Sequence, residues 1–401
     1  MTTLLFARRK RMTRSSVVPA TAALQRIRLT HHLLELQDGH EVGVSVGGAG
    51  VPLVFMHGLA LSRRAYVRML SRVAGLGFLV IAIDAAGHGD TRNLPRNAAD
   101  LADRVDLTVR TLDALGVRQA VFAGHSMGGR MAIQLAAVAP ERVLAAVLFD
   151  AAAGATFEEA VAGLLKSPPR ALRAIAIGGY DTHKDPSRLD AAERGSYLRM
   201  LAAILSRNAR HPGAVAGAGR AIAQSGDYTP MLHVMRDQKI PTMVLHGEND
   251  LVVPFESAVE MADDADATLY KVPDAYHSWM IANPRQGADA MRQLLVGELG
   301  EVLRNAADAL GIGRVDDAAA WQRALLEPDA FVLELNGDAV EEVGVEDPEH
   351  VELELVRQTQ HPHHTKRMPW LRRTYRRWTA INSERGRSGV RSLRPDTRVA
   401  G

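Results

Sequence analysis

The sequence predicts an α/β fold, with a mostly parallel central sheet and helices on both faces. Short apolar runs alternate with longer helical patterns from about residue 27 to residue 300. Several of these runs are apolar throughout, as strands covered on both faces should be. A helical pattern follows most of them, and such crossovers are how parallel strands are connected.

The expected strands share high apolar content and lie between turn-forming residues. They are Glu41–Val46, Leu53–Met56, Phe78–Ile83, Ala120–Ala123, Ala145–Phe149, Thr242–Leu245 and Thr268–Val272. Helices are expected between them, for example over Asp100–Leu115 and Arg130–Val138. The Gly-rich segment Gly47-Gly48-Ala49-Gly50 is expected to be a hairpin loop between the first two strands.

The chain of 401 residues is long enough for one large domain plus an extra element. Residues 1–26 are basic and lack the long apolar stretch of a signal peptide, so we expect an unstructured leader. Residues 27–300 are expected to form the α/β domain, with Ala- and Leu-rich helices inserted at about residues 154–236. Residues 301–401 are a C-terminal extension, in which Val332–Val356 alternates as a strand does.

Composition narrows the classes of function. The sequence contains no cysteine, which excludes disulfides, thiolate metal sites and a cysteine nucleophile. We see no metal-ligand cluster, phosphate loop or dinucleotide fingerprint, so neither a metal nor a cofactor is expected. No apolar run reaches the roughly 18 residues of a membrane-spanning helix, and the cytoplasm is the expected location.

Ser126 lies in the sequence Gly-His-Ser-Met-Gly, between an expected strand and an expected helix. This is G-x-S-x-G in the strand–turn–helix context of a nucleophile elbow. Such a turn is so tight that Gly124 and Gly128 must leave room for the backbone, and His125 completes the elbow. The turn lifts Oγ clear of the sheet at a helix N-terminus, where negative charge is favoured. Ser126 is therefore the predicted nucleophile.

Five segments carry a resemblance to a known family. They are Val54-Phe55-Met56-His57-Gly58, Asp84-Ala85-Ala86-Gly87-His88-Gly89, the elbow, Leu245-His246-Gly247-Glu248-Asn249-Asp250 and Ala275-Tyr276-His277. In order and spacing, the sequence from about residue 40 to 298 resembles the α/β-hydrolase superfamily, in particular its compact bacterial esterases and lipase-like members. We interpret Asp84 and the turn of Gly87 to Gly89 as structural.

The resemblance implies a catalytic triad in the chain order serine, acid, histidine. A serine hydroxyl needs a base to take its proton, and His277, in a loop after a strand, is the expected base. Asp250, in the turn after another buried strand, is the expected acid that orients His277. Asp150, at the end of a third strand, is the rival acid.

An oxyanion hole requires two backbone N–H donors. We expect one from Met127, directly after the nucleophile, and one from Leu59, directly after His57-Gly58. His57-Gly58 can also be read as a simple strand-ending turn. The inserted helices would form a cap whose apolar faces line an acyl pocket, unless they only complete the core.

A serine at the elbow attacks acyl carbons, whereas relatives that open epoxides or cleave carbon–halogen bonds need a carboxylate there. The expected function is hydrolysis of a carboxylic ester of a small or lipid-like substrate through an acyl-enzyme on Ser126. Thioester or C–C bond hydrolysis, perhydrolysis and acyl transfer would use the same triad. A non-catalytic binding module with a basic tail is the alternative from another class.

The C-terminal tail is basic, although the net charge of the chain is only +2. Trp370–Ile381 has a helical pattern, with arginines on one side and apolar and aromatic residues on the other. This helix could pack on the hydrolase core, contact an anionic membrane, or bind nucleic acid or a protein. We favour packing, with the acidic stretch Glu341–Glu354 as partner, and expect no dedicated nucleic-acid site. The oligomeric state is left open.

Overall fold

The computed structural model describes residues 24–95, 100–165, 178, 180, 181, 184, 191–337, 341–360 and 391–396. The strands are β1 Leu24–Ile27, β2 Thr30–Glu35, β3 Glu41–Gly48, β4 Val51–Met56, β5 Phe78–Ile83, β6 Ala120–His125, β7 Val143–Phe149, β8 Thr242–Gly247, β9 Thr268–Val272, β10 Glu342–Glu346, β11 Glu354–Arg357 and β12 Arg391–Asp396. The helices before the cap are α1 Val67–Gly75, α2 Leu101–Leu115 and α3 Met127–Val138.

Residues 154–236, the cap interval, contain the inserted helices. These are α4 Ala155–Leu165, α6 Ala191–Arg210, α7 Pro212–Gln224 and α8 Thr229–Asp237. The later helices are α9 Phe255–Ala265, α10 Trp279–Ala282, α11 Pro284–Val296, α12 Glu298–Leu310, α13 Ala318–Leu325 and α14 Phe331–Asn336. Every strand expected from the apolar runs is present, and none is extended by more than two residues.

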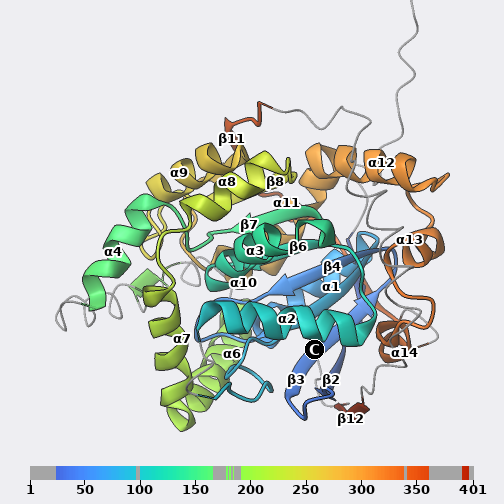
Figure 1. The fold of residues 1–401 in the computed structure, drawn as a ribbon, viewed down its shortest axis with the longest axis horizontal. Helices are drawn as coiled ribbons and strands as arrows, with labels where there is room; N and C mark the ends of the chain where they lie inside the picture. Colours follow the sequence, from blue (N-terminus) through green and yellow to red (C-terminus); the bar gives the residue numbers. More distant parts are fainter. Residues whose placement is uncertain are drawn as a thin grey trace, which may run out of the picture.

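One large sheet forms the centre of the protein, in the order β11-β9-β8-β7-β6-β4-β5-β3-β2-β12. The pairs from β5 through β4, β6, β7 and β8 to β9 are parallel, and the pairs outside them are antiparallel. Helices cover both faces, with α2 and α3 crossing in front of the strands in Figure 1. The predicted fold class is confirmed.

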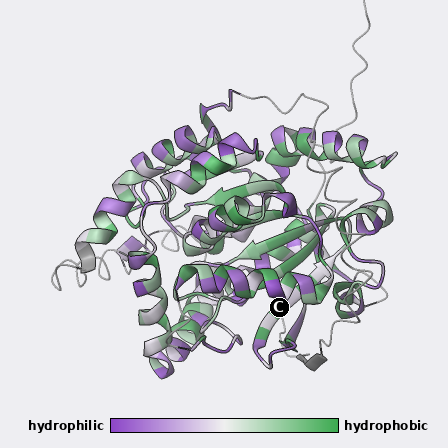
Figure 2. Ribbon diagram, viewed as in Figure 1, coloured by the Kyte–Doolittle hydropathy of each residue, from purple (hydrophilic) through white to green (hydrophobic). Residues whose placement is uncertain are grey.

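The central strands alternate between two apolar layers, one on each face of the sheet. In β4, Val54 and Met56 join one buried cluster, while Leu53 and Phe55 join the other. Each strand is buried throughout because helices pack on both sides, which explains why the runs are apolar without a gap. Figure 2 shows these strands in green, with polar residues gathered on the helices.

The prediction of a hairpin at Gly47–Gly50 is wrong. β3 and β4 follow each other in the chain, but β5 lies between them, antiparallel to β3 and parallel to β4. The chain therefore crosses the end of β5 instead of folding back on itself. Gly50 has a φ of 113°, and a Cβ there would lie 2.1 Å from the carbonyl oxygen of Gly77. The glycines thus serve a close crossing of backbones.

Two further expectations need correction. The end of the expected unstructured leader is ordered, because Leu24–Ile27 forms β1 and pairs antiparallel with β10. Residues 332–356 are not one strand-like segment: Phe331–Asn336 is the helix α14, and β10 and β11 follow it. Alternating Val, Leu and Glu residues are compatible with either structure over so short a run.

The acidic segment of the extension faces arginines near the start of the chain. Glu346 forms ion pairs with Arg26 and Arg72, and Glu341 forms one with Arg28. The expected partner was the basic tail, of which the structure describes β12, paired with β2; contact between the tail helix and the acidic segment stays a prediction. The predicted helix Trp370–Ile381 lies outside the described residues. Among the described helices, none is long and apolar enough to cross a membrane.

Candidate active site

The carboxyl ends of neighbouring parallel strands bring the candidate residues together. Met56 of β4 is aligned with Gly124 of β6, and His125 is aligned with Phe149 of β7. The residues that follow these positions, such as Ser126 and Asp150, therefore share one edge of the sheet. This is the edge where open α/β sheets place their ligands.

Ser126 has the strained backbone that the elbow requires. Its φ is 55° and its ψ is −117°, between the end of β6 and the first residue of α3. The turn tolerates no side chain at Gly128, where a Cβ would lie 2.0 Å from the carbonyl oxygen of Met56. A Cβ at Gly124 would lie 2.3 Å from the carbonyl oxygen of Gly128. Strain of this kind persists where the surrounding structure enforces it, which is typical of functional sites.

His277 and Asp250 form a direct pair. His277 Nδ1 lies 2.7 Å from Asp250 Oδ2, while Asp250 Oδ1 accepts the backbone N–H groups of Val252 and Val253, each at 2.8 Å. Burial opposes ionisation of the carboxyl, but the charge of His277 holds the pKa of Asp250 well below its usual range. In return, Asp250 overcomes the effect of burial and raises the pKa of His277. The pair is built to stabilise an imidazolium.

Asp150 is fully buried behind this pair and has other partners. Its Oδ1 accepts the backbone N–H of Gly247 at 2.8 Å, and its Oδ2 accepts Trp279 Nε1 at 2.9 Å. Burial, reinforced by the charge of Asp250, raises the pKa of Asp150 to about 7. The imidazole of His277 is thus oriented by Asp250, while Asp150 joins the end of β8 to the segment after His277.

Asp150, His246 and Asp250 offer atoms within 4.8 Å of one another, a spacing that could hold a metal ion. The donor set argues for a hydrogen-bonded cluster instead. Both carboxylates accept N–H groups on each oxygen, and His246 Nε2 lies 2.8 Å from the carbonyl oxygen of Val253. The four carboxylate oxygens already accept N–H groups and have few lone pairs left for a cation, although the buried His246 Nδ1 has no hydrogen-bond partner among the described residues.

The loop after β4 is held from both sides. Ala85 donates its backbone N–H to His57 Nε2 at 2.9 Å, so His57 Nδ1 must carry the proton and donate to the carbonyl of Gly58 at 2.8 Å. Burial lowers the pKa of His57, which keeps the ring neutral and this tautomer in place. The Gly58 carbonyl and the Leu59 N–H belong to one planar trans peptide and point in opposite directions. His57 therefore orients the predicted oxyanion donor.

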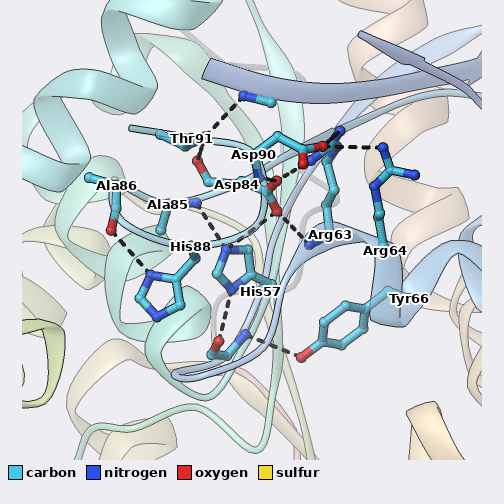
Figure 3. Close-up of polar contacts among 12 residues, drawn as sticks. His57, Arg63, Arg64, Tyr66, Asp84, Ala85, Ala86, His88, Asp90 and Thr91 are labelled. Atoms are coloured by element: carbon cyan, nitrogen blue, oxygen red, sulfur yellow. Dashed lines mark hydrogen bonds and ion pairs between the residues drawn. The ribbon is translucent and has the colours of Figure 1, made fainter. Parts of the chain in front are cut away.

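A buried carboxylate anchors this loop. Asp84 Oδ1 accepts the backbone N–H of Arg63 at 2.8 Å, and Oδ2 accepts that of Asp90 at 2.8 Å and the Arg63 guanidinium (Figure 3). Gly89 is required because a Cβ there would lie 1.8 Å from Asp84 Oδ2. His88 accepts the backbone N–H of Ala60 through Nε2. The expectation that this segment is structural agrees with these contacts.

The cap interval reaches the same loops. Asp181 is buried and accepts the backbone N–H groups of His277 and Leu251, each at 2.9 Å. Asn208 of α6 donates to the carbonyl of Ala60 at 2.8 Å. Both contacts join the inserted segment to the loops of the candidate site. The position of the inserted segment therefore affects the geometry of the site.

The structure therefore places all the predicted site residues at one edge of the sheet. Met127 is the fully buried first residue of α3, where backbone N–H groups have no partner within the helix. Leu59 is half-buried in the loop after β4. Sequence reasoning missed the contacts of Trp279 and Asp181, and that of Tyr66, whose hydroxyl oxygen accepts the backbone N–H of Gly58. No motif or spacing links these residues to the site. For His125, the only signal in the sequence is the elbow motif.

Residues 51–284 match a family model described as "alpha/beta hydrolase fold". A protein of Mycobacterium phage D29 that carries the name of a non-heme haloperoxidase is 40% identical over 279 residues, which cover 67% of this chain and 96% of that protein. The non-heme chloroperoxidase CPO-A1 of Kitasatospora aureofaciens is 25% identical over 260 residues, which cover 59% of this chain and 88% of that protein.

Among solved structures, Est816, described as an N-acyl homoserine lactone degrading enzyme, superposes with a TM-score of 0.52 at 25% identity. The match covers 66% of this chain and 99% of that protein. The residues that the family model matches run from β4 to the start of α11 and include residues 154–236.

Proposed function

Because the chain belongs to the α/β-hydrolase family, we propose that it is a serine hydrolase in which Ser126 attacks the acyl carbon of a small or lipid-like carboxylic ester. The observation that carries this proposal is the strained backbone of Ser126 at the turn from β6 to α3. A left-handed φ at a serine costs free energy, on the order of 1–3 kcal/mol. Such strain is typical of functional sites, and here it would expose the nucleophile.

In the proposed cycle, His277 takes the proton of Ser126 as Oγ attacks the carbonyl carbon. Asp250, 2.7 Å from His277 Nδ1, stabilises the imidazolium that forms. The N–H groups of Leu59 and Met127 would bind the negative oxygen of the tetrahedral intermediate. His277 then protonates the departing alcohol, and a water molecule activated by His277 releases the acid and restores Ser126.

Replacing the nucleophile tests the proposal. Ser126→Ala should abolish hydrolysis of p-nitrophenyl esters and labelling by a fluorophosphonate probe, because no other group could form the acyl-enzyme. Ser71→Ala is a matched control, since Ser71 is also buried and its hydroxyl donates to the carbonyl of Ile27, in β1. It should keep both properties. Ester hydrolysis that persists in pure Ser126→Ala would refute the proposal.

The names of the relatives favour a second candidate reaction, perhydrolysis. An acyl-enzyme on Ser126 attacked by hydrogen peroxide instead of water would release a peroxy acid and the free serine, and the peroxy acid could then oxidise a halide. Bromide oxidation by the purified protein in acetate with hydrogen peroxide would support it. The activity should require acetate and disappear in Ser126→Ala. Oxidation without acetate would exclude this route.

The nature of the acyl group is part of the same proposal. Apolar residues of the cap interval favour an apolar acyl or alkyl group, and a panel of p-nitrophenyl esters of increasing chain length would measure the preference. Thioester hydrolysis, C–C bond hydrolysis and acyl transfer use the same residues and would appear in the corresponding assays. Cytoplasmic residence and contact of the tail with an anionic membrane stay predictions.

A further inference from the structure

A chain of buried hydrogen bonds runs from the loop after β4 to the segment that carries His277. The backbone N–H of Gly58 donates to Tyr66 Oη at 3.2 Å. Tyr66 Oη lies 2.7 Å from His125 Nδ1, and His125 Nε2 lies 2.8 Å from the carbonyl oxygen of His277. Tyr66 comes from the turn Arg63–Tyr66 before α1, and His125 from the end of β6.

The direction of each hydrogen bond follows from its ends. The carbonyl of His277 can only accept, so His125 Nε2 must carry the proton and donate to it. His125 Nδ1 is then an acceptor if the ring is neutral, and the hydroxyl of Tyr66 donates to it. Burial lowers the pKa of His125 to about 3 and therefore keeps the ring neutral. One tautomer and one hydroxyl orientation satisfy every group.

The path is rigid because its members are closely packed. Tyr66 is 0% and His125 1% exposed, and the rings of His125 and His277 lie 4.7 Å apart between centroids. At Gly58, a Cβ would lie 2.8 Å from His125 Nδ1, so only glycine allows this approach. A shift at one end of the path must therefore move the other end or break a buried hydrogen bond.

We propose that Tyr66 and His125 are positioning residues that join the peptide of the oxyanion donor to the catalytic histidine. Gly58 is held at its N–H by Tyr66 and at its carbonyl by His57, so the orientation of the next N–H, that of Leu59, depends on both contacts. His125, beside Ser126 in the chain, ties the same peptide to the backbone of His277. This inference rests on the proposed function, because it assigns the oxyanion donor and the base.

The test is the removal of one oxygen atom. Tyr66→Phe should lower kcat for a p-nitrophenyl ester by about 10- to 100-fold, since displacing a catalytic group by a fraction of an ångström costs rates of this order. KM should change by less than about threefold, because the path contacts no substrate in the proposed cycle. Tyr228→Phe is the matched control: its buried hydroxyl donates to Gln134 at 2.7 Å, away from this path.

A double-mutant cycle separates positioning from general stability. His125→Gln can keep the amide donor to the His277 carbonyl but loses the ring acceptor for Tyr66. Because the two side chains act in one path, the double variant should lose little more kcat than the more impaired single variant. Both tyrosine variants should show similar melting temperatures, since each loses one buried hydroxyl.

The outcomes distinguish the two proposals. A wild-type protein that neither hydrolyses esters nor reacts with the fluorophosphonate refutes the proposed function. A wild-type protein that does both, while Tyr66→Phe and Tyr228→Phe keep the same kcat, refutes the positioning role alone. The role is also refuted if losses of kcat in Tyr66→Phe and His125→Gln multiply in the double variant, since independent effects behave in that way.

Discussion

Asp84 and Asp150 are both fully buried at the carboxyl end of a central strand, yet the protein accommodates them in different ways. Asp84, after β5, accepts hydrogen bonds from the guanidinium and the backbone of Arg63. Asp150, after β7, accepts the neutral N–H donors of Gly247 and Trp279 and lies beside the acid Asp250. The charge of Asp84 is balanced by the Arg63 guanidinium, whereas burial raises the pKa of Asp150 to about 7 and so disfavours its charged form.

The difference follows from what each region must do. The loop near Asp84 holds an uncharged peptide in place, so a permanent ion pair there disturbs no chemistry. Near Asp250, a second permanent negative charge would stabilise the protonated form of His277 and oppose its role as a base. A carboxyl whose pKa is about 7 is roughly half protonated at neutral pH, so it makes its hydrogen bonds while carrying only part of that charge. The two aspartates are thus similarly buried, but an ion pair stabilises the charge of Asp84, whereas the surroundings of Asp150 disfavour its charge.

The largest expected effect distinguishes Asp150 from Asp250 as the acid. Asp250→Asn should lower kcat for ester hydrolysis by about 10⁴-fold, because the imidazole loses the partner that fixes its tautomer. Asp150→Asn should lower kcat by less than about tenfold, because His277 Nδ1 contacts Asp250. Steady-state kinetics on both purified variants measures the difference. Equal losses, or a larger loss for Asp150→Asn, would assign the acid to Asp150.

The next effect concerns the stability provided by the Asp84 ion pair. Asp84→Ala leaves the Arg63 guanidinium, which is 1% exposed, with Asp90 as its remaining carboxylate partner. We expect a loss of about 3–5 kcal/mol in the free energy of unfolding, measured by urea denaturation. The control is Asp106→Ala, which breaks a surface pair with Arg110 and should cost less than about 1 kcal/mol. Similar losses in both variants would show that burial of the pair adds nothing.

The sequence predicted the catalytic residues better than it predicted the buried contacts that surround them. The positions of Ser126, His277 and Asp250 follow from motifs, because the chemistry requires residue types at fixed distances from strands. The contacts of Asp150 with Trp279, or of Tyr66 with His125, depend on how segments distant in the chain pack, and no local pattern encodes them. The crossing at Gly47–Gly50 was missed for the same reason: glycines predict a turn, but the strand that comes between, β5, lies 30 residues later.

The smallest expected effect is the dependence of stability on pH. The pKa of Asp150 is about 7 in the folded protein and near the ordinary 3.8 in the unfolded chain, so between these values the folded state binds more protons. The contribution of Asp150 to stability is therefore fully present below pH 4 and is lost as pH rises to 7. Asp150→Asn removes this loss, so relative to the wild type the variant should gain up to about 1.4 kcal/mol for each pH unit between pH 4 and pH 7.

Urea unfolding of both proteins across this range measures the difference. The comparison uses the difference between variant and wild type because the other titrating groups are common to both proteins and largely cancel. Ser71→Ala, which removes no titrating group, serves as the control and should show a constant difference from the wild type. A difference for Asp150→Asn that is also constant from pH 4 to pH 8 would mean that Asp150 is ionised throughout. Both buried aspartates would then be charged at neutral pH, and the charge of Asp150 would raise the pKa of His277.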